Sequence, residues 1–106
     1  MQEISVLELK RRTDARERLH IIDVREPDEY EAYNIGARLM PLGQIMNMQT
    51  EDIDDLKHEE LIVHCRSGKR SLQACLFLET MGFTNVKNLT GGIIAWQEQC
   101  DGSKGE

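Results

Sequence analysis

The sequence predicts an α/β domain in which helices cover both faces of a mainly parallel sheet. Segments typical of strands alternate with segments typical of helices, and this alternation favours parallel strands joined by helical crossovers. Residues 61–63, Leu-Ile-Val, form a short continuous apolar run, as in a strand buried on both faces. We expect a single domain over residues 1–100, followed by a polar tail over residues 101–106 that frays.

Local signals place the elements before this central strand. Ser5 and Glu8 have the Ser-x-x-Glu spacing of a helix capping box, and Pro27 stands among acidic residues as at a helix start. The predicted elements are a helix over residues 6–16, a strand over 19–24, a short helix from 27 that ends by 34–36, a strand over 37–41, one or two helical turns over 42–48, and a surface helix or structured loop over 50–60. Methionines in these helical turns are interpreted as core filler, because the thioether fills irregular gaps.

After the central strand the sequence predicts a helix, a strand and a final helix. Residues 71–82 carry two apolar stripes, which predict a helix that is buried on most of its circumference and stopped by its last glycine. The stripes consist of Leu72, Cys75 and Leu76, and of Ala74, Leu78 and Met81. Residues 86–89 are predicted to form a short strand, and Gly91-Gly92 a turn into a helix over residues 93–99.

Composition and charge exclude several classes of function. The 106 residues carry a net charge of -6, which argues against a nucleic-acid surface. No apolar run approaches the length of a membrane span, and the start lacks the basic and apolar regions of a secretory leader, so we expect a cytoplasmic protein with no membrane partner. The three cysteines are widely spaced and form no zinc-binding pattern, so we expect neither a metal site nor a disulfide scaffold.

The residues that follow the central strand form a candidate catalytic loop. Cys65 lies at the carboxyl end of that strand, where open α/β sheets bind ligands, and the chain then turns into a helix start. Helix N-termini and nearby cations stabilise a thiolate, and Gly68 can take the positive φ that lets successive N–H groups face an anion. We therefore predict that Cys65 is a nucleophile; the alternative is an inert thiol buried at the strand end.

The rest of the loop is predicted to bind an anionic substrate. Arg70 presents a planar fork of donors suited to an oxyanion, and Arg66 and Lys69 add charge at the rim. Ser71 either donates to sulfur or caps the following helix. The predicted substrate-binding set is therefore Arg66, Ser67, Gly68, Lys69, Arg70 and Ser71.

Asp23 and Arg25 are predicted to support the loop. They lie at the end of another strand, where they could orient the loop or its substrate, and a purely structural ion pair or cap fits the same positions. His64, directly before Cys65, either tunes the site or is an ordinary histidine at a strand end. The sequence alone leaves both alternatives open.

Four stretches of the chain, one of them the candidate catalytic loop, are most informative in combination. They are residues 23–30 (DVREPDEY), residues 35–37 (IGA) leading to Pro41-Leu42, the loop over residues 65–71 (CRSGKRS), and residues 89–96, which contain Gly-Gly-Ile and Trp96. In this combination the chain resembles the rhodanese (sulfurtransferase) domain family. The resemblance implies a five-stranded parallel sheet flanked by helices, with Cys65 as the catalytic cysteine.

Asn34 marks one departure from that family pattern. Family members often have His-Ile-x-Gly-Ala after the acidic helix, whereas this chain has Asn34-Ile35-Gly36-Ala37, with Asn for His and one residue fewer. The shortened form resembles the rhodanese domains appended to the adenylyltransferases that activate sulfur-carrier proteins. This resemblance implies a sulfur-relay setting.

The spacing between Cys65 and Arg70 separates two chemistries. Cysteine-dependent phosphatases carry Cys-x5-Arg, whereas four residues stand between Cys65 and Arg70 here, and a shorter loop suits the outer sulfur of a persulfide better than a phosphoryl group. The sequence thus favours a thiosulfate sulfurtransferase-like enzyme. It would move a sulfane sulfur from a small anionic donor, through a Cys65 persulfide, to a thiol, cyanide or protein acceptor, with no cofactor. The alternatives are a persulfide-carrying relay module that serves a protein partner, and a small cysteine-dependent phosphatase.

Overall fold

A five-stranded sheet, with all strands parallel, forms the centre of the molecule. The computed structural model describes residues 1–100, so the predicted polar tail lies outside the described residues. In spatial order the strands are β1 (Gln2–Ile4), β5 (Val86–Leu89), β4 (Leu61–His64), β2 (Ile21–Asp23) and β3 (Arg38–Leu39). The predicted parallel sheet is confirmed, and β4, which carries the predicted nucleophile at its end, is its central strand.

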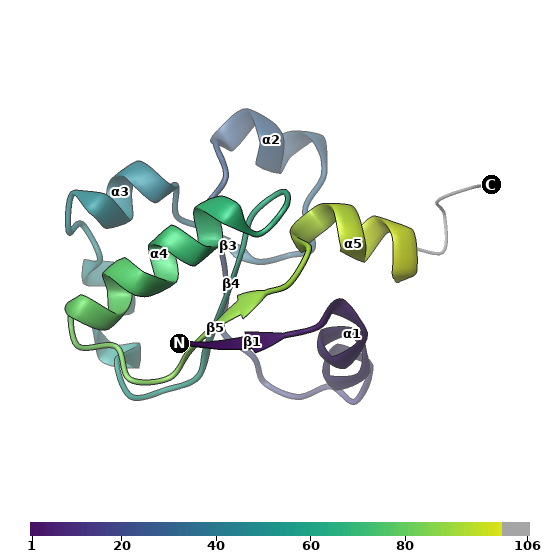
Figure 1. Ribbon diagram of the computed structural model, residues 1–106, viewed down its shortest axis with the longest axis horizontal. Helices are drawn as coiled ribbons and strands as arrows, with labels where there is room; N and C mark the ends of the chain where they lie inside the picture. The colour runs from purple at the N-terminus through teal and green to yellow at the C-terminus, as the bar shows by residue number, and fades with distance from the viewer. Residues whose placement is uncertain (101–106) are drawn as a thin grey trace.

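Helices cover both faces of the sheet, as predicted. Figure 1 shows α1 and α5 to one side of the strands and α3 and α4 to the other, with α2 beside the loop that precedes α4. The helices are α1 (Val6–Asp14), α2 (Pro27–Ala32), α3 (Leu42–Met46), the 3-10 helix η1 (Glu51–Leu56), α4 (Lys69–Thr80) and α5 (Gly92–Gln99). No helix within residues 1–100 is long and apolar enough to cross a bilayer.

The continuous apolar run of β4 is explained by two cores, one on each face of the sheet. Successive side chains of a strand point to opposite faces. Leu61 and Val63 therefore join the larger core with Leu78 of α4, whereas Ile62 joins the smaller core with Leu9 of α1. All of these side chains are buried, so β4 is enclosed on both sides and its carboxyl end is held in place.

The observed elements differ from the predicted ones mainly at the first strand and at helix ends. The sequence did not predict β1 as a separate strand. It is only three residues long and exposes Gln2 and Glu3 at the edge of the sheet. Ser5 does cap α1 through Glu8 N–H, as the capping box predicts, but α1 ends at Asp14 rather than residue 16. α4 begins at Lys69, two residues earlier than predicted, directly after the loop glycine.

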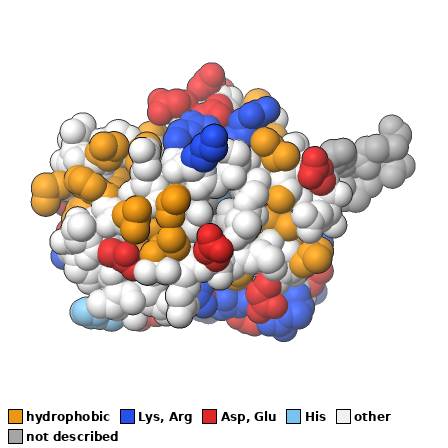
Figure 2. All heavy atoms as spheres, viewed as in Figure 1, with side chains coloured by type: hydrophobic (Ala, Val, Ile, Leu, Met, Phe, Trp, Pro, Cys, Tyr) orange, Lys and Arg blue, Asp and Glu red, His pale blue; other side chains and the backbone are white. Residues whose placement is uncertain are grey.

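Two predictions of burial are wrong. Leu72 and Leu76 of α4 are 37% and 50% exposed, and Met46 and Met48 are 51% and 64% exposed. α3 is only five residues long and leaves Leu72 and Leu76 of α4 partly uncovered, and Met46 and Met48 lie at and just beyond its exposed end. Apolar side chains consequently remain visible over α3 and α4 in Figure 2.

A charged network ties α1 to the two central strands. Arg12 of α1 donates two hydrogen bonds to the Glu60 carboxylate, with N–O distances of 2.8 and 2.6 Å, and Lys87 of β5 lies 2.6 Å from the same carboxylate. The side chains of all three residues are less than one quarter exposed. The hydrogen bond from Arg12 is the main reason that the pKa of Glu60 falls to about 2, against the opposing effect of burial.

Replacing Glu60 with glutamine is expected to lower the free energy of unfolding by about 1–2 kcal/mol near neutral pH. A carboxyl whose pKa is lowered by folding adds stability above its unfolded pKa of about 4.3 and loses it as pH falls toward the folded value. The difference between wild type and Glu60→Gln should therefore shrink as pH falls from about 5 toward 2. Urea denaturation at several pH values measures it. Glu59→Gln, at an exposed neighbouring position, is the control, and an equal loss there would contradict this role.

Candidate active site

Cys65 lies directly after β4, with its sulfur inside a ring of hydrogen-bond donors. The Sγ atom accepts hydrogen bonds from the backbone N–H of Gly68 at 3.1 Å and of Ser71 at 3.4 Å, and the Ser71 hydroxyl lies 3.5 Å away. Ser71 is the third residue of α4, so its N–H is one of the donors that the first helical turn leaves without a helical acceptor. Cys65 is only 1% exposed.

The glycine and the helix start build this ring together. Gly68 has φ +104°, the left-handed conformation predicted for the loop, and α4 begins at the next residue. That conformation turns the chain through the loop so that the Gly68 N–H faces the sulfur rather than solvent. The loop and the positive end of α4 thus meet at Cys65.

The donors around Cys65 outweigh the effect of its burial. Burial alone favours the neutral thiol, but the Ser71 hydroxyl and the N–H groups of Ser71, Gly68 and Ser67 stabilise the thiolate, so the pKa of Cys65 falls below its ordinary value. The Ser71 hydroxyl also donates to Asn88 Oδ1. Because a hydroxyl has one proton, Ser71 donates to either Asn88 or the sulfur at any moment.

The loop is also held from the neighbouring strand and from the last helix. Asn88 of β5 donates from Nδ2 to the Gly68 carbonyl at 3.2 Å. At the start of α5, the N–H groups of Ile93 and Ile94 donate to the carbonyls of Cys65 and Arg66 at 2.9 and 3.0 Å. These bonds turn the loop carbonyls away from the sulfur, so that N–H groups face it.

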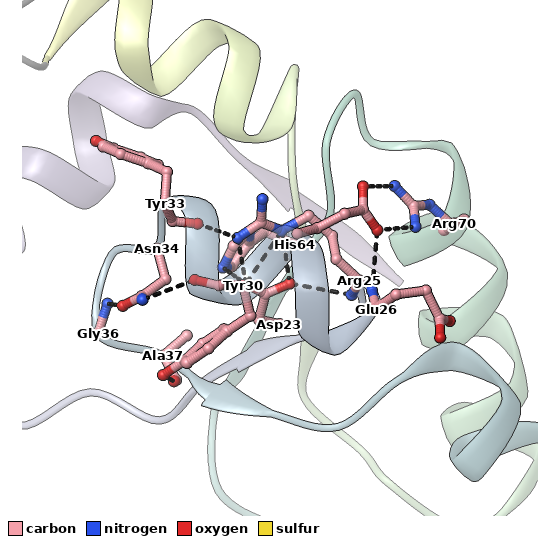
Figure 3. A network of polar contacts seen from close by, with 11 residues as sticks. Asp23, Arg25, Glu26, Tyr30, Tyr33, Asn34, Gly36, Ala37, His64 and Arg70 are labelled. Carbon is pink, nitrogen blue, oxygen red and sulfur yellow. Dashed lines mark hydrogen bonds and ion pairs between the residues drawn. The ribbon is translucent and has the colours of Figure 1, made fainter.

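The guanidinium of Arg70, which the sequence predicts to bind an oxyanion of the substrate, is occupied by a carboxylate of the protein. It forms a two-pronged ion pair with Glu29 of α2, with N–O distances of 2.7 and 2.9 Å. Figure 3 shows Arg70 reaching from the start of α4 toward α2. This hydrogen-bonded pair lowers the pKa of Glu29 to about 2 and raises the pKa of Arg70, so both groups are charged at neutral pH.

The remaining predicted binding residues lie at the rim of the loop. Arg66, Ser67 and Lys69 are exposed, and within residues 1–100 the side chains of Arg66 and Lys69 form no hydrogen bond or ion pair. Figure 2 shows cationic side chains gathered over the start of α4, beside acidic side chains over α2. Two exposed cationic side chains are therefore available to an anion that approaches the loop.

Asp23 and Arg25 form a buried ion pair, which fits the structural interpretation of these residues. The Asp23 carboxylate accepts from the Arg25 backbone N–H at 3.0 Å and from Arg25 Nη2 at 2.8 Å, and Nη2 also donates to the Tyr33 carbonyl at 2.7 Å (Figure 3). Within residues 1–100 neither side chain bonds to the candidate catalytic loop. The pair instead fixes the chain between β2 and the segment after α2.

His64 is enclosed behind the loop. Its Nε2 lies 3.7 Å from the Asp23 carboxylate, and neither ring nitrogen has a hydrogen-bond partner within residues 1–100. Burial lowers the pKa of His64, so the imidazole is neutral at neutral pH. No group of three His, Cys, Asp or Glu side chains among the described residues is placed to share a metal ion.

Comparisons with known proteins assign this fold and loop to a family. A family model described as the rhodanese-like domain matches residues 5–99.

The chain belongs to the rhodanese-like domain family.

Among its relatives, a putative sulfurtransferase of Bacillus subtilis, YtwF, is 38% identical over 99 residues, which cover 92% of this chain and 91% of the relative. MoeZ of Mycobacterium tuberculosis, a probable adenylyltransferase/sulfurtransferase, is 34% identical over 98 residues, which cover 91% of this chain and 24% of MoeZ. The crystal structure of a rhodanese-like domain protein from Staphylococcus aureus has a TM-score of 0.79 and 30% identity, with 91% of each chain covered. The resemblance inferred from the four sequence stretches is confirmed, and the relatives' names support sulfurtransferase activity in general.

Sequence reasoning missed two residues that build the loop of this rhodanese-like domain. Asn88 was assigned only to a strand, although an amide inside an otherwise apolar strand is a signal, because a buried amide needs partners. Gly92 was interpreted as part of a turn. A Cβ atom there would lie 2.4 Å from the Cys65 carbonyl oxygen and 2.6 Å from that of Arg66, so only glycine lets α5 approach the loop.

The other two cysteines lack the donors that surround Cys65. Cys75 is buried in the larger core, and burial raises its pKa to about 12. Cys100 is partly exposed, lies 3.4 Å from the Val6 carbonyl, and also has a raised pKa because of burial. Within the described residues Cys65 is therefore the thiol with the greatest tendency to ionise.

The first prediction for the site concerns the Ser71 hydroxyl. Ser71→Ala removes one donor to the thiolate and leaves the backbone donors, so the Cys65 pKa should rise by about 0.5–1 unit. The midpoint of the pH–rate profile for iodoacetamide labelling of the Cys65 peptide, read by mass spectrometry, measures the change. Ser67→Ala is the matched control, since only the backbone N–H of Ser67 faces the sulfur. An unchanged midpoint in Ser71→Ala would contradict the assigned role.

The second prediction concerns the contact between α5 and the loop. Gly92→Ala should lower the free energy of unfolding by at least about 2 kcal/mol, because the new Cβ would overlap two carbonyls and the residue has a positive φ. Gly43→Ala is the control: a Cβ at Gly43, inside α3, meets no atom within 4 Å. Urea denaturation of both variants is the measurement. Similar stability of the two would show that the close approach of α5 is not required.

Proposed function

We propose that this protein transfers a sulfane sulfur from an anionic donor such as thiosulfate to a thiophilic acceptor, through a persulfide on Cys65. The observation that carries the proposal is the set of donors around the Cys65 sulfur, namely the N–H groups of Gly68 and Ser71. A persulfide places its negative charge on the outer sulfur, and a ring of N–H groups at a helix start stabilises such an anion. The sulfurtransferase names of its relatives support the same reaction class.

The first half of the proposed reaction loads Cys65. The Cys65 thiolate attacks the outer sulfur of thiosulfate and forms a new S–S bond, while the S–S bond to the sulfonate breaks and sulfite leaves with its electron pair. The lowered pKa of Cys65 increases the fraction of the attacking thiolate at a given pH. Arg66 and Lys69, exposed at the rim, would draw the anionic donor toward the loop.

The second half of the proposed reaction transfers the outer sulfur from Cys65 to the acceptor. Cyanide carbon, or the sulfur of an acceptor thiolate, attacks the outer sulfur of the persulfide, and the electron pair of the broken S–S bond returns to Cys65. With cyanide the product is thiocyanate, and the enzyme regains its starting state without an external oxidant, reductant or metal. Because the donor product leaves before the acceptor reacts, the kinetics should be ping-pong.

The phosphatase alternative has less support. A phosphatase of this type needs an arginine fork directed at the phosphoryl oxygens, and Arg70 is instead paired with Glu29. In addition, only four residues separate Cys65 from Arg70. We therefore retain sulfur transfer as the proposed chemistry.

The relay alternative differs from enzymatic turnover only in the acceptor. The likeness to one part of MoeZ favours it, because MoeZ is named as both an adenylyltransferase and a sulfurtransferase. In that setting Cys65 would hold sulfur until a partner protein takes it, in a cytoplasm where other thiols stay reduced. The two functions share the first half-reaction and differ in the rate of sulfur release to small acceptors.

Incubation of the protein with thiosulfate and cyanide should give thiocyanate, and Cys65→Ser should abolish it. Mass spectrometry of the protein after thiosulfate alone should show the addition of one sulfur atom at Cys65. Cys100→Ser is the matched control and should retain activity, because Cys100 lies away from the loop beside Val6.

The outcomes separate the candidates. Full activity of Cys65→Ser would overturn the mechanism, and Cys65-dependent hydrolysis of an aryl phosphate would favour the phosphatase. A stable Cys65 persulfide with negligible thiocyanate formation would favour the relay module over the enzyme.

A further inference from the structure

Glu29 of α2 occupies a position that directly affects the charge of the catalytic loop. Its two carboxylate oxygens accept hydrogen bonds from the two terminal nitrogens of Arg70, at 2.7 and 2.9 Å. Arg70 is one of the two loop arginines, whose planar forks match an oxyanion better than the ammonium of Lys69 does. In the structure the fork of Arg70 is already filled by a carboxylate of the protein itself.

We propose that Glu29 is a specificity-determining residue, which biases the loop against dianionic sulfur donors such as thiosulfate and toward donors that carry a single negative charge. This inference rests on the proposed sulfur transfer through Cys65. It narrows the substrate class of that reaction, since a donor with one negative charge, such as the persulfide anion of an uncharged thiol, would be preferred to a dianion.

The charges of the loop support the inference. The loop sequence contains three cations, and the ion pair with Glu29 cancels the charge of one of them. Arg66 and Lys69 remain to attract an anion, and their exposed side chains are screened by water. Because coulombic attraction is proportional to the charge of the donor, the loss of one cation weakens the binding of a dianion twice as much as that of a monoanion.

Glu29 is held in place for this role by its own helix. Its Oε1 also accepts the backbone N–H of Glu26 at 2.9 Å, which fixes the carboxylate at the start of α2. α2 in turn is fastened by Tyr30, whose hydroxyl donates to the Ala37 carbonyl, and by Asn34, which donates to the Tyr30 carbonyl. Figure 3 draws these contacts together with the ion pair of Arg70. The Glu29 carboxylate, on a side chain that is 28% exposed, is therefore held by three hydrogen bonds, one from the start of α2 and two from Arg70.

The experiment compares two donors that load Cys65 by the same step. Thiosulfate is a dianion and releases sulfite, whereas benzenethiosulfonate is a monoanion and releases benzenesulfinate. In both cases the Cys65 thiolate forms an S–S bond to the outer sulfur, and the leaving group departs with the electron pair of the broken S–S bond. With cyanide as the acceptor, kcat/KM for each donor reports the loading step.

Glu29→Gln should raise kcat/KM for thiosulfate about fivefold and for benzenethiosulfonate about twofold, because Arg70 becomes available to the donor. The amide oxygen of glutamine can still accept the Glu26 N–H, so α2 keeps its cap. Glu31→Gln is the matched control: Glu31 is exposed on the same helix, and its replacement makes the same change in net charge. Both rates should stay near wild type in Glu31→Gln.

Arg70→Gln tests the inference from the other partner. It leaves Glu29 without its cation, so kcat/KM should fall more for thiosulfate than for benzenethiosulfonate, by about fivefold against about twofold. The double variant has no charge at either position. The ratio of its kcat/KM values for the two donors should therefore equal that of wild type. Arg70→Gln keeps the inference testable if Glu29→Gln does not fold, and circular dichroism checks the fold of each variant.

The results distinguish this inference from the proposed function. If wild type takes sulfur from neither donor, the proposed function fails. Suppose instead that wild type is active while Glu29→Gln and Arg70→Gln each change kcat/KM by the same factor for both donors. In that case Glu29 has only a structural role, and the inference is overturned. A changed ratio that the double variant restores supports it.

Discussion

The site depends on one constraint: several N–H groups must face a single sulfur while the carbonyls of the same loop face away. An isolated loop does not hold this arrangement, because its carbonyls need partners of their own. Here α5 supplies them, through the N–H groups of Ile93 and Ile94, and Asn88 supplies one more for Gly68. The close packing of α5 on the loop, possible because residue 92 is glycine, is therefore what allows Cys65 to be surrounded by donors.

The strand order explains why these partners are available. β4 lies between β5 and β2, so the residues at the carboxyl ends of these neighbours flank the loop. β5 contributes Asn88, and β2 contributes Asp23, which is bonded to Arg25 and lies beside His64. Asn88 of β5 bonds to the loop itself, whereas Asp23 of β2 holds the chain beside His64. The parallel sheet thus delivers polar groups to one edge from segments that are distant in sequence.

The parts of the molecule that the sequence predicted are those set by local chemistry. The apolar run of β4, the cap at Ser5 and the left-handed Gly68 all follow from neighbouring residues, and the structure has each of them. Pairings between distant segments were not predictable in this way. Arg70 and Glu29 are 41 residues apart, and nothing near Arg70 indicates that its fork is filled. The exposure of Leu76 likewise depends on how far α3 extends over α4, which is a property of packing and not of periodicity.

The bonds from α5 to the loop also have a consequence for the order in which the protein matures during synthesis. Cys65 and the start of α4 leave the ribosome well before residues 92–94, whose N–H groups and glycine complete the loop. A nascent chain that stops short of this segment contains the cysteine but lacks the partners that orient the loop carbonyls. The hydrogen bonds that hold the carbonyls of Cys65 and Arg66 are therefore completed only after the final helix has docked on the loop.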